Sequence, residues 1–209
     1  MNVPTSPATT VSAGVTWEAW NIPREAREAR QRHRAAVVWF TGMPGAGKTT
    51  TARAVELRLF ALDCRTMLLD GDQLRHGLCG DLGFSPADRE ENVRRAGHVA
   101  HLFFEQGAIA LCAFVSPYAV ARARVRALMP DGRFIEVFVK ADIETCRARD
   151  PKGLYARASK GGLDQLTGVS APYEEPVAPE ITIDTRIITA DTAAEMVIDF
   201  LRRRHLIDV

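Results

Sequence analysis

The stretch from Gly42 to Thr49 has residue types and a spacing suited to binding phosphate. It completes the pattern of a phosphate-binding loop (P-loop): Gly, four residues, Gly, Lys and then Ser or Thr. Glycines let backbone N–H groups approach phosphate oxygens, and a helix start behind them favours negative charge. Lys48 is expected to reach the β- and γ-phosphates of a nucleotide, and the Thr49 hydroxyl to ligate Mg²⁺. A glycine-rich turn without a ligand is the alternative. The candidate residues are Gly42, Met43, Pro44, Gly45, Ala46, Gly47, Lys48, Thr49 and Thr50.

Segments on both sides are of the kind that must position such a loop. Residues 36–41 form an unbroken apolar and β-branched run, typical of a buried parallel strand. Residues 50–62 carry apolar side chains at helical spacing. The loop is therefore predicted to join a strand to a helix, which is the context that the motif requires.

Two carboxylates, Asp70 and Asp72, follow a second apolar strand at residues 64–69. Because ligands of open α/β sheets collect beyond the carboxyl ends of the strands, both should face the phosphate site. An Asp-Gly turn is the alternative, and it accounts for one carboxylate but not for two.

A third group of polar residues lies at the start of a predicted helix. Ser85 to Asp88 is typical of a helix N-terminus, and the helix should run to about Gln106 and stop at Gly107. Arg89 and Asn92 are three residues apart, so they share a face and could bind one anionic ligand together. Either residue alone is more typical of a solvated surface.

The rest of the chain alternates strands with helices. Strands are predicted at residues 108–115, 133–140 and 180–185. Helices are predicted at 119–128, with Arg122, Arg124 and Arg126 on it, from the cap Asp142 to Arg149, and at 191–204. The fold class is therefore α/β, a doubly wound parallel sheet of about five strands with helices on both faces.

Two segments stand apart from this alternation. Residues 151–180 are rich in Gly, Pro, Lys and Ser and are predicted to be an irregular lid, made basic by Lys152, Arg157 and Lys160 for closure over phosphates. Residues 1–34 are predicted to be an N-terminal extension. Its first 16 residues should be loosely ordered, Trp17 and Trp20 should dock on the body or on a second subunit, and residues 23–34 should form a solvated surface helix.

Length and composition bound the protein class. The chain has 209 residues and a formal net charge of +1, which fits one α/β domain at 35–209 and does not indicate a nucleic-acid partner. Its four cysteines are far apart, so buried thiols are expected rather than disulfides or zinc ligands. No leader and no apolar run of membrane-spanning length is apparent, so a cytoplasmic enzyme is expected, without membrane attachment.

Six further motifs follow the phosphate loop in a fixed order. They are Asp70-Gly71-Asp72, Arg75-His76-Gly77-Leu78, Asp81-Leu82-Gly83-Phe84, Asp88-Arg89 with Asn92, Phe114-Val115-Ser116-Pro117 and Arg149-Asp150-Pro151-Lys152-Gly153-Leu154-Tyr155. With these motifs the chain closely resembles the adenylylsulfate kinases, from about residue 15 to the C-terminus. The resemblance implies a P-loop kinase that transfers the γ-phosphoryl group of ATP to the ribose 3′-hydroxyl of adenosine 5′-phosphosulfate (APS), giving 3′-phosphoadenosine 5′-phosphosulfate and ADP in sulfate activation. It also implies Mg²⁺ and a homodimer, and association with a sulfurylase is a further expectation.

The resemblance also implies roles for individual residues. Asp72 would be the base or orienter at the 3′-hydroxyl, Lys152 would close over the transferring phosphates, and Arg149 would lie against the adenine of ATP. Phe84 would stack on the adenine of APS. The catalytic set is Lys48, Asp72, Ser116 and Lys152. The substrate set is Asp70, Asp72, Arg75, Phe84, Arg89, Asn92, Val115, Ser116, Lys152 and Leu166.

Bacterial members of the family are described as passing through a phosphoserine at the position of Ser116. Phosphoryl transfer needs in-line geometry and charge neutralisation rather than a covalent nucleophile. No histidine or other obvious activating base adjoins Ser116 in the sequence. A hydroxyl in a turn at the end of a strand is the alternative role for this residue.

The chain departs from the family pattern mainly in the lid. Leu166 stands where an aromatic residue usually stacks on the substrate adenine, and the other departures are Ala119, Ala156, Ser159 and Ser170. These changes leave open a kinase of the same fold that acts on another nucleotide conjugate. A GTPase-like switch is a weaker alternative, because the Asn-Lys-x-Asp motif is absent. A non-catalytic nucleotide-binding partner of a sulfurylase is disfavoured by the intact Lys48, Thr49, Asp70 and Asp72.

Overall fold

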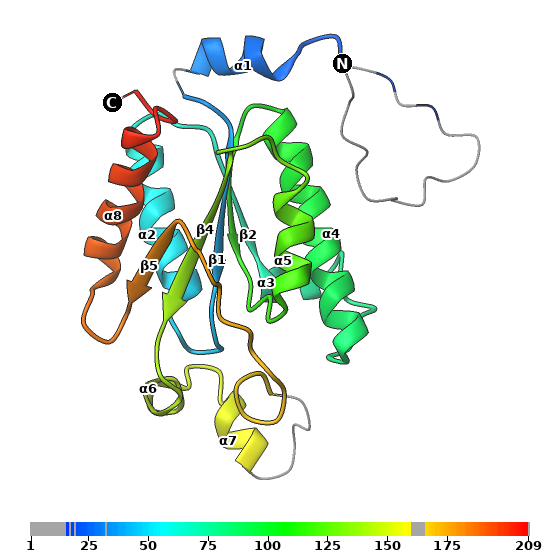
Figure 1. Cartoon of the computed structure of the whole chain (residues 1–209), viewed down its shortest axis with the longest axis vertical. Helices are drawn as coiled ribbons and strands as arrows, with labels where there is room; N and C mark the ends of the chain where they lie inside the picture. The colour runs from blue at the N-terminus through cyan, green and yellow to red at the C-terminus, as the bar shows by residue number, and fades with distance from the viewer. Residues whose placement is uncertain (1–15, 17, 19, 32, 160–165, 209) are drawn as a thin grey trace.

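A five-stranded sheet forms the centre of the molecule (Figure 1). The computed structural model describes residues 16, 18, 20–31, 33–159 and 166–208. All neighbouring strands are parallel, in the order β2-β3-β1-β4-β5. The strands are β1 (Ala36–Thr41), β2 (Thr66–Asp70), β3 (Ile109–Ala113), β4 (Phe134–Lys140) and β5 (Ile181–Asp184). The predicted parallel α/β sheet is confirmed.

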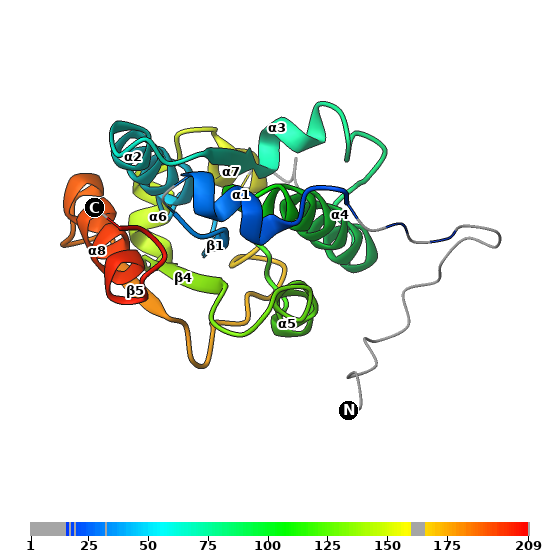
Figure 2. The same cartoon turned by 90° about the horizontal axis from the view of Figure 1, so that it is seen from above.

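Helices cover both faces of this sheet, as the views from the front and from above show (Figures 1 and 2). The pair α2 and α8 packs on one face, and α4 with α5 packs on the other. The helices are α1 (Arg24–Gln31), α2 (Lys48–Ala61), α3 (Gly71–Arg75), α4 (Pro86–Glu105), α5 (Ala119–Arg126), α6 (Ile143–Arg149), α7 (Leu154–Ser159) and α8 (Ala190–Arg203).

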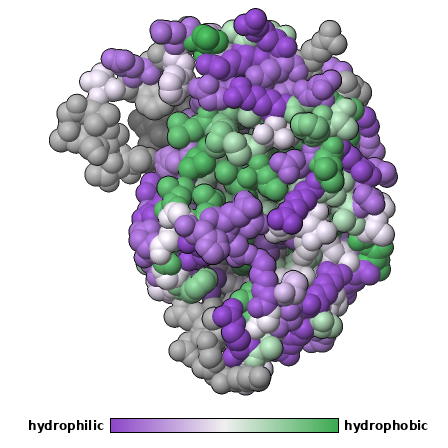
Figure 3. Space-filling model, turned by 180° about the vertical axis from the view of Figure 1, so that it is seen from behind, coloured by the Kyte–Doolittle hydropathy of each residue, from purple (hydrophilic) through white to green (hydrophobic). Residues whose placement is uncertain are grey.

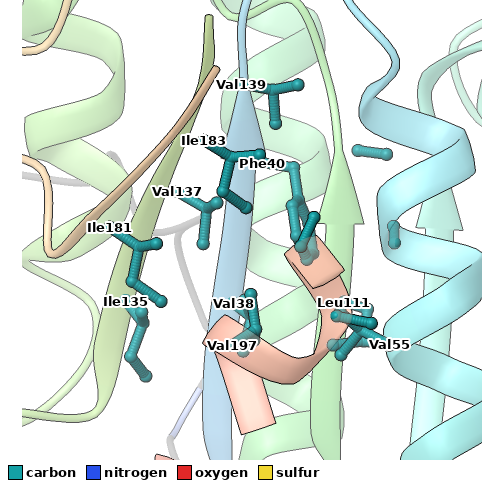
Figure 4. Close-up of a cluster of buried hydrophobic side chains, with 14 of the residues drawn as sticks. Val38, Phe40, Val55, Leu111, Ile135, Val137, Val139, Ile181, Ile183 and Val197 are labelled. Atoms are coloured by element: carbon teal, nitrogen blue, oxygen red, sulfur yellow. The ribbon is translucent and has the colours of Figure 1, made fainter. Parts of the chain in front are cut away.

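The central strand β1 is buried along its whole length because both of its faces are covered. Val38 and Phe40 point into the cluster under α2 and α8, and Trp39 points into the cluster under α4 and α5. Figure 4 shows the first cluster, in which side chains of the strands meet Val55 of α2 and Val197 of α8. The strand that leads into the phosphate loop is thus held from both sides.

Two short helices were not predicted. At Asp70-Gly71 a turn was the alternative considered, but Asp70 is the N-cap of α3 and its carboxylate accepts a hydrogen bond from the Asp72 N–H. The lid was predicted to be irregular from 151 to 180, yet it contains α7, where Asp150 accepts a hydrogen bond from the Ala156 N–H. Lys160 lies outside the described residues.

Helix α1 lies on the surface and has no buried residue. Ion pairs attach it to the body, because Glu28 binds the buried Arg133 and Arg24 binds Glu105 of α4. Trp20 is 52% exposed, and Trp17 and residues 1–15 lie outside the described residues, so docking of the tryptophans on a second subunit stays a prediction. No helix in the described part of the chain has the length and apolar character needed to cross a membrane.

Candidate active site

A pocket of about 1230 Å³ opens at the carboxyl ends of the strands. It is lined by residues of the phosphate loop, by the segments that follow β2 and β3, and by the lid. Of the predicted site residues, Gly42, Met43 and Ala46 do not line it. Those that do are Pro44, Gly45, Gly47, Lys48, Thr49, Thr50, Asp70, Asp72, Arg75, Phe84, Arg89, Asn92, Val115, Ser116, Arg149, Lys152 and Leu166.

The phosphate loop needs glycine at two places for different reasons. Gly42 packs so closely on β4 that a Cβ there would overlap the Val139 carbonyl oxygen. Gly47, directly before α2, has a φ of 98°, a left-handed conformation that other residues rarely adopt. The loop can therefore bend tightly and present backbone N–H groups at the start of α2, where the partial charge favours phosphate.

The Lys48 ammonium folds back over its own loop. Its Nζ donates hydrogen bonds to the carbonyl oxygens of Gly42, at 2.9 Å, and Met43, at 2.8 Å. Burial lowers the pKa of Lys48 to about 8, because the charged form loses hydration. A phosphate group bound in the loop would place negative charge beside Lys48 and stabilise its charged form.

Two oxygen ligands for a cation meet beside the loop. The Thr49 hydroxyl donates a hydrogen bond to Asp70 Oδ2 at 2.6 Å, and Asp70 is only 6% exposed. Hydroxyl and carboxylate oxygens fit the preference of Mg²⁺ for hard ligands. The described residues include no group of three or more His, Cys, Asp or Glu side chains placed to hold a metal, so these two residues fit an ion that also takes phosphate oxygens and water as ligands.

The lid reaches across the pocket to the end of β2. Lys152 Nζ forms an ion pair with Asp72 Oδ2. Both side chains are more than half exposed, so the pair contributes little to stability and can exchange partners readily. The predicted base and the predicted lid cation therefore contact each other in this structure.

Elsewhere in the pocket lining, the side chains of Arg75 and Arg89 lie beside the exposed phenyl ring of Phe84. The Arg75 guanidinium lies 4.3 Å from the ring centroid of Phe84, which is 51% exposed. Arg89 Nε donates to the Phe84 carbonyl oxygen at 2.9 Å, and Arg89 Nη1 donates to the Thr167 hydroxyl at 2.7 Å. Two guanidinium groups and an aromatic face at one place suit a ligand that carries both anionic groups and a base.

The Asn92 amide lies near these arginines in the pocket lining. The residue is 8% exposed, and its Nδ2 has no hydrogen-bond partner among the described residues. Because a buried donor without a partner is costly, a ligand that accepts a hydrogen bond from Asn92 would gain affinity.

Comparison with known proteins decides the family. The sequence model described as adenylylsulphate kinase matches residues 34–184. The chain belongs to the adenylylsulfate kinase family. It is 50% identical over 190 residues to the adenylyl-sulfate kinase of Geotalea uraniireducens, with 91% of each chain covered.

Two solved adenylylsulfate kinase structures resemble the chain. The Mycobacterium tuberculosis APS kinase CysC, in complex with AMPPNP and APS, is 43% identical with a TM-score of 0.78, over 81% of this chain and 99% of that one. The hexameric APS kinase from Thiobacillus denitrificans is 33% identical with a TM-score of 0.65, over 86% of this chain and 32% of that one. The family relationship confirms the resemblance inferred from the motifs.

Within this adenylylsulfate kinase fold, Ser116 has a hydroxyl that is already engaged. The residue is 3% exposed and has a φ of 39°, which is unusual for a residue other than glycine. Its Oγ accepts a hydrogen bond from Trp39 Nε1 and donates to Thr41 Oγ1, both at 3.0 Å. Among the described residues, its hydrogen-bond partners are Trp39, Thr41 and the Phe114 carbonyl, and none of these is a carboxylate or an imidazole. This arrangement favours the strand-end turn role over the phosphoserine role.

The departures from the adenylylsulfate kinase pattern at Leu166 and Ser170 form a compact turn. The Leu166 carbonyl accepts hydrogen bonds from three successive N–H groups, those of residues 169 to 171, and the Leu166 N–H donates to Ser170 Oγ at 3.0 Å. Gly168 lies against the Met43 side chain, where a Cβ would come within 2.7 Å of the sulfur. The turn therefore rests directly on the phosphate loop and buries Leu166 to 4% exposure.

Arg149, the remaining residue predicted to bind nucleotide, lies at the end of α6. It donates to the Thr185 hydroxyl at 2.9 Å and to the Thr185 carbonyl at 2.6 Å. Thr185 Oγ1 in turn donates to the Ala46 carbonyl at 2.9 Å. Arg149 is thus tied to the phosphate loop through Thr185.

Sequence reasoning missed several residues that the site uses. Thr167 and Thr185 were not assigned, although Thr167 lies beside the recognised departure at Leu166. Arg122 was noted only as one of three arginines on a helix, but it is 3% exposed and hydrogen-bonded to the Ser116 carbonyl. Arg122, Arg124 and Arg126 alternate with apolar residues on this helix, and nothing in that pattern distinguishes the buried arginine from the other two.

Proposed function

We propose that this chain transfers the γ-phosphoryl group of ATP to the ribose 3′-hydroxyl of APS. The observation that carries the proposal is that one pocket is lined both by residues of the phosphate loop and by Arg75, Arg89 and Asn92, whose Nδ2 has no hydrogen-bond partner among the described residues. A triphosphate fits the first set, and a second anionic nucleotide fits the other. The family membership and the relative that binds AMPPNP and APS support the same pair of substrates.

The loop N–H groups and Lys48 would hold the ATP phosphates in line with the acceptor. Asp72 would accept a hydrogen bond from the 3′-hydroxyl and take its proton as the oxygen–phosphorus bond forms and ADP leaves. This step requires Lys152 to exchange Asp72 for a phosphate oxygen. Thr49 and Asp70 would hold Mg²⁺, which neutralises charge on the phosphates when it is bound.

The homodimer is also part of the proposal. Figure 3 shows apolar side chains gathered on the face of the molecule seen from behind. On α2, Leu57 and Phe60 are 71% and 75% exposed. They are three residues apart on one helix face, and a solved member of the family is hexameric. We assign this α2 face to contact with a second copy of the chain.

A cytoplasmic location is supported by the cysteines. Cys64, Cys79, Cys112 and Cys146 are all free and buried, as predicted. Unpaired thiols are typical of a reducing compartment.

The assay offers ATP, Mg²⁺ and a panel of adenylates, namely APS, AMP and adenosine 5′-phosphoramidate, and detects a new 3′-phosphate by ³¹P NMR. Phosphorylation of APS in preference to the others is expected. Preference for another adenylate would support the alternative kinase that the lid departures left open. ATP binding without any transfer would support the non-catalytic alternative.

A further inference from the structure

A buried guanidinium joins three parts of the structure behind the acceptor side of the pocket. Arg122 of α5 is 3% exposed. Its Nε donates to Glu136 of β4 at 2.7 Å, its Nη1 to the Ser116 carbonyl at 2.8 Å, and its Nη2 to the Glu174 carbonyl at 2.8 Å. Each of its three nitrogen atoms has a different partner.

The first backbone partner is the turn that borders the pocket after β3. Ser116 has a positive φ, so its conformation requires support from its surroundings. Arg122 binds its carbonyl, and Trp39 and Thr41 bind its hydroxyl. Hydrogen bonds therefore hold both the backbone carbonyl and the side-chain hydroxyl of Ser116, which lines the pocket together with Val115.

The second backbone partner is the segment that returns from the lid. The Glu174 N–H donates to the Pro117 carbonyl at 2.8 Å, and Glu174 Oε2 accepts from the Ala119 N–H at 2.6 Å. Next to it, the Tyr173 hydroxyl lies 3.1 Å from Thr41 Oγ1. Arg122 thus joins the Ser116 turn to the end of the segment that begins with Leu166 and Thr167.

Only an arginine can make these contacts together. Its planar group presents donors in three directions, whereas a lysine ammonium is a single point. Glu136 balances the buried charge, and Arg126 holds the other Glu136 oxygen at 3.4 Å while pairing with Glu180. Among the described residues, none of these hydrogen bonds and ion pairs includes a residue of the phosphate loop.

We propose that Arg122 is a positioning residue for the acceptor substrate. Arg122 holds the Ser116 turn and the Tyr173–Glu174 segment at a fixed distance from each other. In this way it sets the positions of Thr167 and its hydrogen-bond partner Arg89 relative to Asp72. The proposal rests on the proposed function, because it concerns the binding of APS in that pocket. It predicts that loss of the guanidinium geometry affects the acceptor and leaves ATP binding in place.

The test compares Arg122→Lys with Arg124→Gln in the full chain. Arg124 is two residues away on the same helix, and its 63% exposed side chain pairs with Glu90 on the surface, so it is the matched control. In Arg122→Lys, KM for APS should rise by about tenfold or more, the scale of one charge-assisted hydrogen bond, while KM for ATP stays within about twofold. Arg124→Gln should keep both constants.

A second readout separates positioning from stability. Trp39 donates its indole N–H to Ser116, so its ¹H–¹⁵N resonance reports the geometry of that turn in the folded protein. The resonance, assigned with Trp39→Phe, should move in Arg122→Lys and stay in place in Arg124→Gln at a temperature where both are folded. If Arg122→Lys does not fold, Glu136→Gln loosens the same guanidinium and takes its place.

The possible failures are distinct. An unaltered chain that does not phosphorylate APS would refute the proposed function. An active chain in which Arg122→Lys keeps its KM for APS, or raises both KM values equally, would refute the positioning role. An unmoved Trp39 resonance in a variant with altered kinetics would also contradict it.

Discussion

At the scale of single residues, the most unusual group is the Lys48 ammonium. It is buried within its own loop, and burial lowers its pKa to about 8. Near that pH the free enzyme holds Lys48 partly neutral, whereas a bound triphosphate stabilises the charged form. Nucleotide affinity should therefore decrease as the pH rises above 8.

Calorimetry can detect this proton. Binding of a non-hydrolysable ATP analogue at pH 8 should take up about half a proton per site, and little at pH 6.5, where Lys48 is already charged. The measurement compares heats in buffers of different ionisation enthalpy. Lys48→Arg is the control, because a guanidinium stays charged and should abolish the uptake. Equal uptake in the variant would assign the proton to another group.

Leu166 is the residue at which this chain most clearly departs from its family. It lines the pocket, where an aromatic residue is usual in the family, and in the proposed function one face of the substrate adenine would lack a stacking partner there. Leu166→Phe should lower KM for APS by about fivefold, the effect of about 1 kcal/mol of stacking. Val169→Phe adds a ring to the 45% exposed neighbour in the same turn and should change nothing. An unchanged KM in Leu166→Phe would mean that another group already covers the adenine.

At the scale of elements, the connection between α1 and β1 depends on a neutral imidazole. His33 is 2% exposed and its Nε2 accepts a hydrogen bond from the Arg65 N–H at 3.0 Å. Burial lowers the pKa of His33, and the nearby Glu28 only partly opposes this. The unfolded chain therefore binds more protons than the native one below the ordinary histidine pKa of about 6.5.

The free energy of unfolding should therefore fall as the pH drops below about 6.5, by about 1.4 kcal/mol for each unit between the native and unfolded pKa. Urea unfolding at pH 7 and pH 5 measures it. His33→Gln offers an oxygen to the Arg65 N–H but does not titrate, so the pH dependence should be smaller in this variant. His101, whose pKa is also lowered by burial, accounts for a residual slope in both proteins. Identical slopes would show that His33 is not responsible.

Sequence patterns predicted the elements whose burial is uniform. The limits of β1 were predicted correctly, because both of its faces are buried and every residue is apolar or β-branched. The start of α4 was also predicted correctly, since residues 85–88 contain the N-cap serine, the proline of the first turn and the aspartate that together mark a helix N-terminus. Helix α3 was missed because Asp70-Gly71 has the composition of a turn, and α7 because Pro151 and Gly153 come directly before it. The role of Arg122 could not be predicted, since two of its three partners, Glu136 and Glu174, lie 14 and 52 residues away in the chain and no local pattern links them to it.

At the scale of the whole molecule, the exposed pair Leu57 and Phe60 is the strongest sign of association. If the α2 face contacts a second copy, Phe60→Asp should shift the protein from dimer to monomer, because a charge would be buried without a partner. Light scattering after gel filtration measures the mass. Arg53→Asp, a polar change on the same helix, should leave the mass as it is. A Phe60→Asp protein that stays dimeric would place the contact elsewhere.

The start of β1 and the end of α8 lie together at the edge of the sheet that faces away from the pocket. His33 and Ile207 form a bridge there, and the Arg34 N–H donates to the Leu206 carbonyl at 2.8 Å. A second protein module attached near either segment would lie at the end of the kinase opposite the pocket. Nucleotides could then enter and leave without crossing the attached module, and linkers of many lengths would be tolerated.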